Sequence, residues 1–299
     1  IHIPDFKSGY DYREESLSRS VGGKGVNVSK VLAFLGVSTR ATGFLAHNGS
    51  MYMKEEMLRH AIKPDFIPIG GNVRTSLTII DPHSIKLTRI MERGPRVKRH
   101  EAAAFMQKYE RLLSRSSAVI LSGRSIPGVR DSFYAQLIER ARKKGVRTLL
   151  DTSGKPYPLG LRRKPFMIKP NAEEAEAALH MRVRSRKDIC RAIDLFSRHG
   201  IQIIAITDGS RGAYVYDGRE CVYARPPRLK RRNPVGCGDS FIAGFWAAFT
   251  QKRSLRECVL NAVACGSANA LSVDPGNVSR RAINRLKKKI TVKNIRLSF

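Results

Sequence analysis

The residues best suited to chemistry lie in the stretch Asn233-Pro-Val-Gly-Cys-Gly-Asp-Ser240. Two glycines there flank Cys237, and an acid, Asp239, follows directly. Apolar residues then recur at helical spacing, which predicts an amphipathic helix beginning at this turn: Phe241, Ile242, Phe245, Trp246 and Phe249. Free backbone N–H groups and the helix dipole favour negative charge at such a point, but an acid in the first turn also serves as a cap. The stretch alone therefore fits a phosphate site and a capped core helix equally well.

A second glycine turn, Gly22-Gly-Lys-Gly-Val-Asn27, precedes another predicted helix with Val28, Val31, Leu32 and Leu35 on one face. The turn lacks the spacing to Lys-Ser/Thr that a Walker motif requires. It also lacks the strand–turn–helix context of a dinucleotide fingerprint. By itself it is a weak signal.

Polar side chains follow each strand of a predicted parallel sheet. Buried strands are predicted at residues 118–122, 147–151, 166–169 and 201–207. The groups at their carboxyl ends are Ser122, Asp151, Lys169, Asn171, Glu174, Thr207 and Gly209. Each alone is typical of a turn or a cap, but ligands of open parallel sheets bind at that edge. Together with the turn before Asp239, these groups predict one binding site.

The elements that must position these groups alternate regularly from residue 100 onward. Helices are predicted at residues 101–113, 130–144, 172–179, 186–199, 255–271 and 280–289, and a hairpin at 212–224. Alternation of helices and strands predicts an α/β fold with helices on both faces of the sheet. Earlier in the chain, a strand at 39–45, a helix at 51–60 and a hairpin of 73–80 with 86–91 are expected.

Composition restricts the partners and the compartment. The 299 residues suffice for one large α/β domain or two smaller ones, and no apolar run is long enough to span a bilayer. The net charge of +30 indicates anionic partners. No aromatic residues interleave with the basic runs at 228–232 and 285–289, so specific nucleic-acid binding is not expected. Five scattered cysteines favour free thiols in a reducing compartment, the cytoplasm.

These motifs together resemble the ribokinase/PfkB family of carbohydrate kinases. The turn at 22–27 is similar to the family's N-terminal signature, and 233–240 is similar to its C-terminal signature, in which the acid is the catalytic base. Lys169-Pro-Asn-Ala-Glu-Glu174 is similar to the Asn-x-x-Glu motif, which is tied to magnesium and phosphate. The resemblance covers nearly the whole chain. It implies a ribokinase-like three-layer α/β/α fold with a mostly parallel central sheet, with a core of residues 21–65 and 99–299 and a small β-lid of residues 1–20 and 66–98.

Within the family, the sequence resembles 1-phosphofructokinase and tagatose-6-phosphate kinase most closely. Lys24 in the first turn and Arg74 in the predicted strand match that branch, and a cationic pair suits an anionic sugar. The resemblance implies ATP-dependent phosphorylation of a ketohexose phosphate, with fructose 1-phosphate giving fructose 1,6-bisphosphate. Alternatives are tagatose 6-phosphate or another sugar or nucleoside and, from another class, a non-catalytic sugar- or nucleotide-binding protein.

The resemblance also implies a role for each matching residue. Asp239 would be the base, with Gly236, Cys237 and Gly238 as the anion hole. The sugar phosphate would contact Gly22, Gly23, Lys24, Asn27, Arg74 and Ser122. ATP would contact Lys169, Thr207, Gly209, Gly212 and Asn261, with Ser267 as a further candidate, and Mg²⁺ would be held through water by Asn171 and Glu174. Lids of this family often pair between subunits, which implies a homodimer.

Two features depart from the family pattern. The turn position that is usually Ala or Ser is Cys237, which is small enough to keep the backbone geometry. The family's first core strand, with an Asn-Pro-x-x-Asp motif whose acid binds sugar hydroxyls, is expected to precede Ile1 and is not among these 299 residues.

Overall fold

The computed structural model describes residues 1, 3, 5–12, 19–81, 87–124, 126–230 and 232–297. Its α-helices are α1 (Lys24–Phe34), α2 (Ser50–Arg59), α3 (Arg99–Leu113), α4 (Phe133–Lys143), α5 (Pro156–Leu161), α6 (Ala172–Leu179), α7 (Arg186–Ser197), α8 (Cys237–Thr250), α9 (Leu255–Ala270) and α10 (Arg280–Lys287). Its strands are β1 (Arg40–Ala41), β2 (Phe44–Asn48), β3 (Lys63–Pro64), β4 (Ile67–Asn72), β5 (Ser76–Ile80), β6 (Leu87–Met91), β7 (Ala118–Ser122), β8 (Arg147–Asp151), β9 (Met167–Ile168), β10 (Ile203–Thr207), β11 (Ala213–Tyr216), β12 (Cys221–Arg225) and β13 (Thr291–Ile295).

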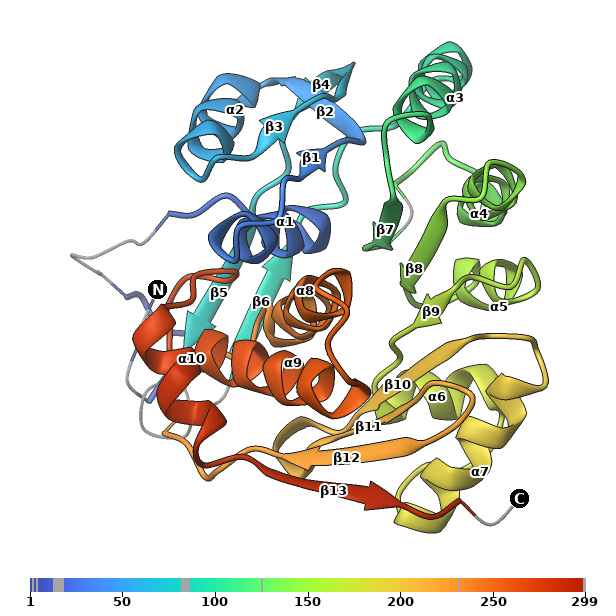
Figure 1. Cartoon of the computed structure of the whole chain (residues 1–299). Helices are drawn as coiled ribbons and strands as arrows, with labels where there is room; N and C mark the ends of the chain where they lie inside the picture. Colours follow the sequence, from blue (N-terminus) through green and yellow to red (C-terminus); the bar gives the residue numbers. More distant parts are fainter. Residues whose placement is uncertain are drawn as a thin grey trace.

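Seven strands form the central sheet, in the order β13-β12-β11-β10-β9-β8-β7 (Figure 1). The strands from β7 to β10 run parallel, whereas β10 to β13 pair antiparallel. The predicted α/β fold is confirmed, and the sheet is mixed because the hairpin β11–β12 and the last strand β13 extend it. Sequence patterning did not predict β13, since most of this edge strand is exposed and its apolar residues do not alternate regularly.

Helices cover both faces of the sheet, with α3 to α7 on one side and α1, α8 and α9 on the other (Figure 1). Successive strand residues alternate between the two sides: Leu149, Met167, Ile203 and Ala205 belong to one core, and Leu150, Ile168, Ile204 and Ile206 to the other. Strands buried on both faces are continuous apolar runs. This is why the sequence predicted β10 closely, whereas β8 has only Leu149 and Leu150 as apolar residues.

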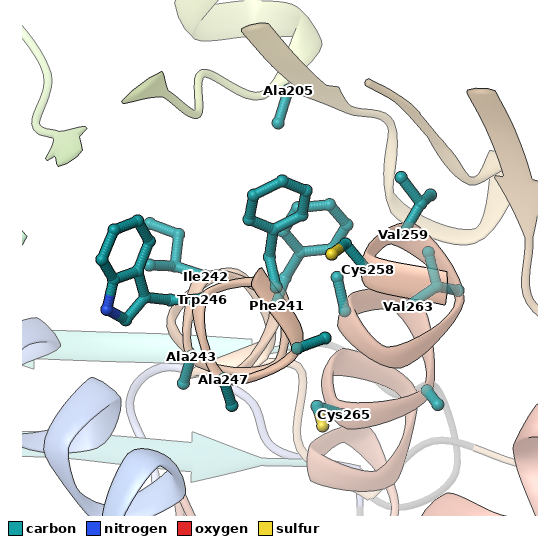
Figure 2. Close-up of a cluster of buried hydrophobic side chains, with 14 of the residues drawn as sticks. Ala205, Phe241, Ile242, Ala243, Trp246, Ala247, Cys258, Val259, Val263 and Cys265 are labelled. Atoms are coloured by element: carbon teal, nitrogen blue, oxygen red, sulfur yellow. The ribbon is translucent and has the colours of Figure 1, made fainter. Parts of the chain in front are cut away.

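The helix α8 lies at the centre of its layer. The predicted apolar stripe is confirmed, because Phe241, Ile242, Phe245 and Trp246 are buried. The prediction of an amphipathic helix was wrong, however, because every residue from Asp239 to Ala248 is buried. The reason is that two helices, α9 and α1, pack on the side expected to face solvent, and Figure 2 shows α9 beside α8.

Three two-stranded sheets lie outside the central sheet: β1–β3 and β2–β4, both parallel, and β5–β6, antiparallel. The expected hairpin is present as β5–β6, and the amide of Ile3 donates to the carbonyl of Ile80 at its margin. Two expectations need correction. Arg74 lies in the connector between β4 and β5 and not in a strand, and the strand expected at 39–45 is divided into β1 and β2 around Gly43, whose φ is +150°.

The outer edge of β7 has no strand partner among the described residues, and neither does one edge of β2. Apolar side chains of β7 such as Val119 and Ile120 are consequently only half-buried, unlike Leu149 and Leu150 on the neighbouring strand. The expectations about the family's first core strand and about the domain boundaries stay predictions.

Two expectations from composition concern membrane-spanning segments and the state of the cysteines. No helix in the described part of the chain combines the length and the apolar character that crossing a membrane requires. The five cysteines are free thiols, as predicted, and Cys221, Cys258 and Cys265 are buried.

Candidate active site

The turn before α8 exposes backbone amides at a helix N-terminus. Gly236 caps the helix with φ +83°, and a Cβ there would lie 3.1 Å from Asn269 Oδ1 and from Pro275 Cβ. The left-handed conformation favours glycine, and the close contacts leave little room for a side chain. The described hydrogen bonds include no acceptor for the amides of Gly236 and Gly238, whereas the amide of Val235 donates to Asn233 Oδ1 at 2.9 Å. The turn thus offers two free donors beside Asp239.

Asn269 holds this turn in place. Its Nδ2 donates to the carbonyl of Val235 at 2.7 Å, and its Oδ1 accepts from the amide of Gly276 at 2.7 Å. The side chain is 1 % exposed. Sequence reasoning missed Asn269 because an asparagine inside a predicted helix carries no signal of its tertiary partners.

Asp239 joins the two glycine turns. Asn27, from α1, donates through Nδ2 to Asp239 Oδ2 at 2.8 Å, across 212 positions of sequence. Burial raises the pKa of Asp239 from 3.8 to about 6, and the charge of Asp151 adds to this, while the Asn27 hydrogen bond, Lys24 and Lys169 act in the opposite direction. A carboxyl with such a pKa can accept a proton near neutral pH.

Asp151 connects two lysines on opposite sides of the site. Its Oδ2 lies 3.4 Å from Lys24 Nζ, and its Oδ1 lies 3.2 Å from Lys169 Nζ. Ser122 Oγ also donates to Asp151 Oδ2, at 3.2 Å. Burial alone would raise the pKa of Asp151, but the charges of Lys169 and Lys24 outweigh burial and hold that pKa below its ordinary value. The strand-end pattern indicated Asp151, but nothing in the sequence marked it as the bridge.

Lys169 stands beside the amides of the turn. A Cβ on Gly238 would lie 3.2 Å from Lys169 Nζ. The side chain is 4 % exposed, and although burial favours the neutral amine, the charges of Asp151, Glu174 and Asp239 raise the pKa of Lys169 overall. A buried ammonium group therefore faces the same space as the free amides, which suits a multiply charged phosphate.

Asn171 and Glu174 form the N-terminal cap of α6. Asn171 Oδ1 accepts from the amide of Glu174 at 2.7 Å, and Glu174 Oε2 accepts from the amide of Asn171 at 2.9 Å. The described residues hold no cluster of three His, Cys, Asp or Glu side chains arranged around a metal. The second carboxylate oxygen of Glu174 is outside the cap, so the pair fits a Mg²⁺ ion bound mainly by water and phosphate.

One cleft of about 3290 Å³ contains nearly all the predicted site residues. It is lined by Gly22, Gly23, Lys24, Asn27, Arg74, Ser122, Lys169, Asn171, Glu174, Thr207, Gly209, Gly212, Gly236, Cys237, Gly238, Asp239 and Ser267. The cleft extends beyond these residues, past Leu112 and Ser116 to the outer edge of β7, so its volume includes space well outside the predicted site. Gly212 has a structural reason for being glycine, because a Cβ there would collide with the carbonyl oxygen of Ala224.

Asn261 is the predicted site residue that the structure places elsewhere. Its Nδ2 donates to the carbonyl of Gly244 at 2.6 Å, which fixes α9 against α8. It lines a small surface hollow near Lys287 and not the cleft. The helical pattern had placed Asn261 on the helix next to the site, but its position around that helix is set by the close contact with Gly244.

Lys24 and Arg74 also differ from the expected pair of free cations. Lys24 already has an acidic partner in Asp151, and its side chain is 38 % exposed. Arg74 is exposed in its connector, packs against Gly94 and has no ion-pair partner among the described residues. Of the two residues expected to bind a sugar phosphate, Lys24 therefore has an ion-pair partner, and Arg74 has none among the described residues.

Solved structures share this architecture over nearly the whole chain. A protein of Staphylococcus aureus assigned provisionally as a phosphofructokinase is 27 % identical, with a TM-score of 0.83 over 100 % of this chain and 95 % of that one. A possible 1-phosphofructokinase of Thermotoga maritima is 24 % identical, with a TM-score of 0.89 over 99 % of this chain and 95 % of that one. Phosphofructokinase-2 of Escherichia coli, solved with substrates and products, is 24 % identical, with a TM-score of 0.88 over 96 % and 94 %.

The model of the pfkB family of carbohydrate kinases matches residues 4–281 of the chain. The match includes both glycine turns, Asp239 and the Asn171–Glu174 pair. Because the match spans most of the chain, the chain belongs to the pfkB family of carbohydrate kinases.

Proposed function

We propose that the protein transfers the γ-phosphate of ATP to a hydroxyl of a ketohexose phosphate, with fructose 1-phosphate as the first candidate acceptor. The observation that carries this proposal is Asp239, which is 4 % exposed, has a pKa raised to about 6 and stands at the N-terminus of α8. A carboxylate there can accept the proton of the attacking hydroxyl while the helix N-terminus stabilises charge on the phosphoryl group.

The other residues of the cleft support this division of roles. The amides of Gly236 and Gly238 and the ammonium of Lys169 would hold the transferring phosphoryl group. Thr207, Gly209 and Gly212 would form the wall of the ATP site, and Mg²⁺ near Asn171 and Glu174 would neutralise phosphate charge. Asn27 positions Asp239 by its hydrogen bond, and Asn27 Oδ1 is buried with no hydrogen-bond partner among the described residues.

The choice of acceptor rests chiefly on Arg74. Because Lys24 is already paired with Asp151, Arg74 is the cation whose charge an acceptor phosphate would neutralise. Tagatose 6-phosphate would satisfy the same requirement. We expect Arg74→Ala to raise the KM for the sugar phosphate much more than the KM for ATP. An equal rise in both would assign Arg74 a structural role.

A panel of sugars and sugar phosphates, assayed with MgATP for ADP release, tests the activity. Substituting Asp239→Asn should lower kcat by about 10²-fold or more on the best acceptor, because the hydroxyl proton then has no acceptor. The thermal unfolding profile of the variant shows that it is folded. Undiminished turnover of Asp239→Asn would disprove the assignment, and ligand-induced stabilisation without ADP release would favour a binding protein.

Two further features concern the oligomeric state and the cellular compartment of the protein. The hairpin β5–β6 exposes Leu77, Ile90 and Met91, which supports a homodimer formed through the lid. Five free thiols support a reducing compartment such as the cytoplasm.

A further inference from the structure

The basic residues of α10 are not explained by catalysis. Arg281, Arg285 and Lys288 stand at positions i, i+4 and i+7, on one side of the helix, and Lys289 follows directly. We call these four residues the α10 basic stripe. All four are exposed, and none of them lines the cleft that contains Asp239. The phosphates of ATP and of a sugar therefore cannot account for them.

Charge neutralisation distinguishes this stripe from the basic residues at the end of α4. At the end of α4, Arg142 lies 3.3 Å from Glu139, and Lys144 lies 3.3 Å from Glu110. Within the described residues, no member of the α10 basic stripe has an ion-pair partner. Residues 251–297 contain only two acids, Glu257 and Asp274. Glu257 is engaged in the cap of α9, and Asp274 lies on the cleft.

The stripe contributes little to the stability of its own helix, because two small effects oppose each other. Arg285 in the last turn and Lys288 at the C-cap interact favourably with the helix dipole. Like charges at i and i+4, such as Arg281 with Arg285, repel each other on a helix surface. What fixes α10 is the opposite side, where Ile283 and Leu286 are buried at 3 % and 2 % exposure in the core beside α9. The four cations could be replaced by neutral side chains without loss of packing, so their position favours an external anion.

The burial of Ile283 and Leu286 also bears on which anionic partner the stripe can bind. A helix anchors in a bilayer by inserting its apolar side, and that side of α10 is committed to the core, so a bilayer could be held only by charge, which the vesicle measurement below tests. Binding of unstacked bases requires aromatic side chains, and residues 250–298 contain no Phe, Trp or Tyr. The anionic partner that fits best is a nucleic-acid duplex, whose phosphates form a regular array. Cations spaced along one side of a helix can contact these phosphates without reading bases.

We propose that the α10 basic stripe binds the phosphate backbone of a nucleic-acid duplex, without sequence preference and outside the catalytic cleft. This proposal does not depend on the identity of the sugar acceptor. It also agrees with the expectation, drawn from the sequence, that specific nucleic-acid recognition is absent.

The test compares two triple variants of the full chain that lose equal charge from similar places. One is Arg285→Gln, Lys288→Gln and Lys289→Gln. The matched control is Arg142→Gln, Lys143→Gln and Lys144→Gln, which are also exposed residues at a helix end. Binding of a short fluorescent DNA duplex is followed by anisotropy between about 50 and 200 mM salt. Kinase turnover of both variants should stay at the wild-type level, because neither set lines the cleft.

We expect the α10 variant to bind the duplex at least tenfold more weakly, with a salt slope smaller by about 0.9 for each phosphate that the variant no longer neutralises. The control should stay near wild type. Equal weakening in both variants would show binding by overall charge and overturn the proposal. So would absence of wild-type binding at physiological salt, or retention by vesicles of anionic lipid but not by the duplex.

A second measurement avoids any dependence on folding of the variants. In the wild-type protein, bound duplex should protect Lys288 and Lys289 from acetylation more than it protects Lys143 and Lys144, as read by mass spectrometry. Equal protection of the two lysine pairs would contradict the proposal.

Discussion

At the scale of single residues, Asp239 is unfavourable for stability and suited to catalysis for the same physical reason. Burial opposes its charge, and the neighbouring Asp151 adds to that effect, so its pKa is raised to about 6. Between its ordinary pKa of 3.8 and about 6, the folded state therefore binds more protons at this site than the unfolded state does. The contribution of Asp239 to stability consequently falls as pH rises through this window.

We therefore expect Asp239→Asn to melt at a higher temperature than wild type at pH 7.5, with the difference shrinking as the pH approaches about 4. In the wild type, kcat/KM should fall about tenfold per pH unit below about pH 6, because the base becomes protonated. Thermal unfolding and initial rates across a pH series measure both effects. A variant less stable than wild type at pH 7.5 would show that Asp239 is not held in a disfavoured charge state.

Asp151, in contrast to Asp239, stabilises the folded state. It provides the counter-charge of Lys169, which is only 4 % exposed. Asp151→Asn would leave that ammonium without its closest acid, and removing one partner of a buried pair costs about 3 kcal/mol or more. Chemical denaturation should show this decrease in the free energy of unfolding. The double variant with Lys169→Met is the control and should recover much of it. An unchanged midpoint for Asp151→Asn would contradict this role.

At the scale of elements, the position of the site depends on the contact between α8 and α9. The two helices approach closely because residue 244 is glycine: an added Cβ would lie 2.8 Å from Cys265 Sγ and 2.9 Å from the carbonyl oxygen of Asn261. The same pair of helices carries Asp239 at one N-terminus and Asn269 near the end of the other. A change in helix spacing would therefore displace the turn that holds the free amides.

We expect Gly244→Ala to lower the free energy of unfolding by about 1–3 kcal/mol, because the added methyl group overpacks the contact. Gly25→Ala is the matched control, since a Cβ at this helical glycine in α1 has nothing within 4 Å. The control should be stabilised by about 0.5–1 kcal/mol, since alanine favours helix. Denaturation curves of the two variants measure the contrast. Equal midpoints would show that the two helices can separate freely.

At the scale of the whole molecule, the cleft lies between the core and the segment around the β5–β6 hairpin. Arg74 is exposed in the connector to this hairpin and lines the same cleft as Asp239. The cleft is open to solvent, whereas a phosphoryl transfer must exclude water. We infer that the hairpin segment closes over the substrates.

Closure should slow tryptic cleavage after Arg74 when a sugar phosphate and a non-hydrolysable ATP analogue are both bound. The peptide products can be followed by mass spectrometry. Cleavage after Lys252, an exposed residue between α8 and α9 that does not line the cleft, is the internal control and should keep its rate. Slowing of both sites to the same extent would indicate general stabilisation and no closure.

Sequence patterns were sufficient to predict most of the elements and the sheet edge whose polar groups line the cleft. Apolar runs predicted β7 and β10, because strands that contact helices on both faces are largely apolar, and the pair Leu149–Leu150 marked β8. The glycine turns and the polar strand ends predicted that these groups meet at one edge, since carboxyl ends of parallel strands share one edge. These features are local in sequence or follow from general topology.

Which polar groups act together depends on tertiary packing. The bond from Asn27 to Asp239 spans 212 positions, and the Asp151–Lys24 ion pair joins residues that no periodicity relates. The structure also removed Asn261 from the cleft and showed α8 to be enclosed on all sides. Pairing and burial depend on how helices and strands pack in space, and the electrostatic shifts that prepare Asp239 arise from that packing alone.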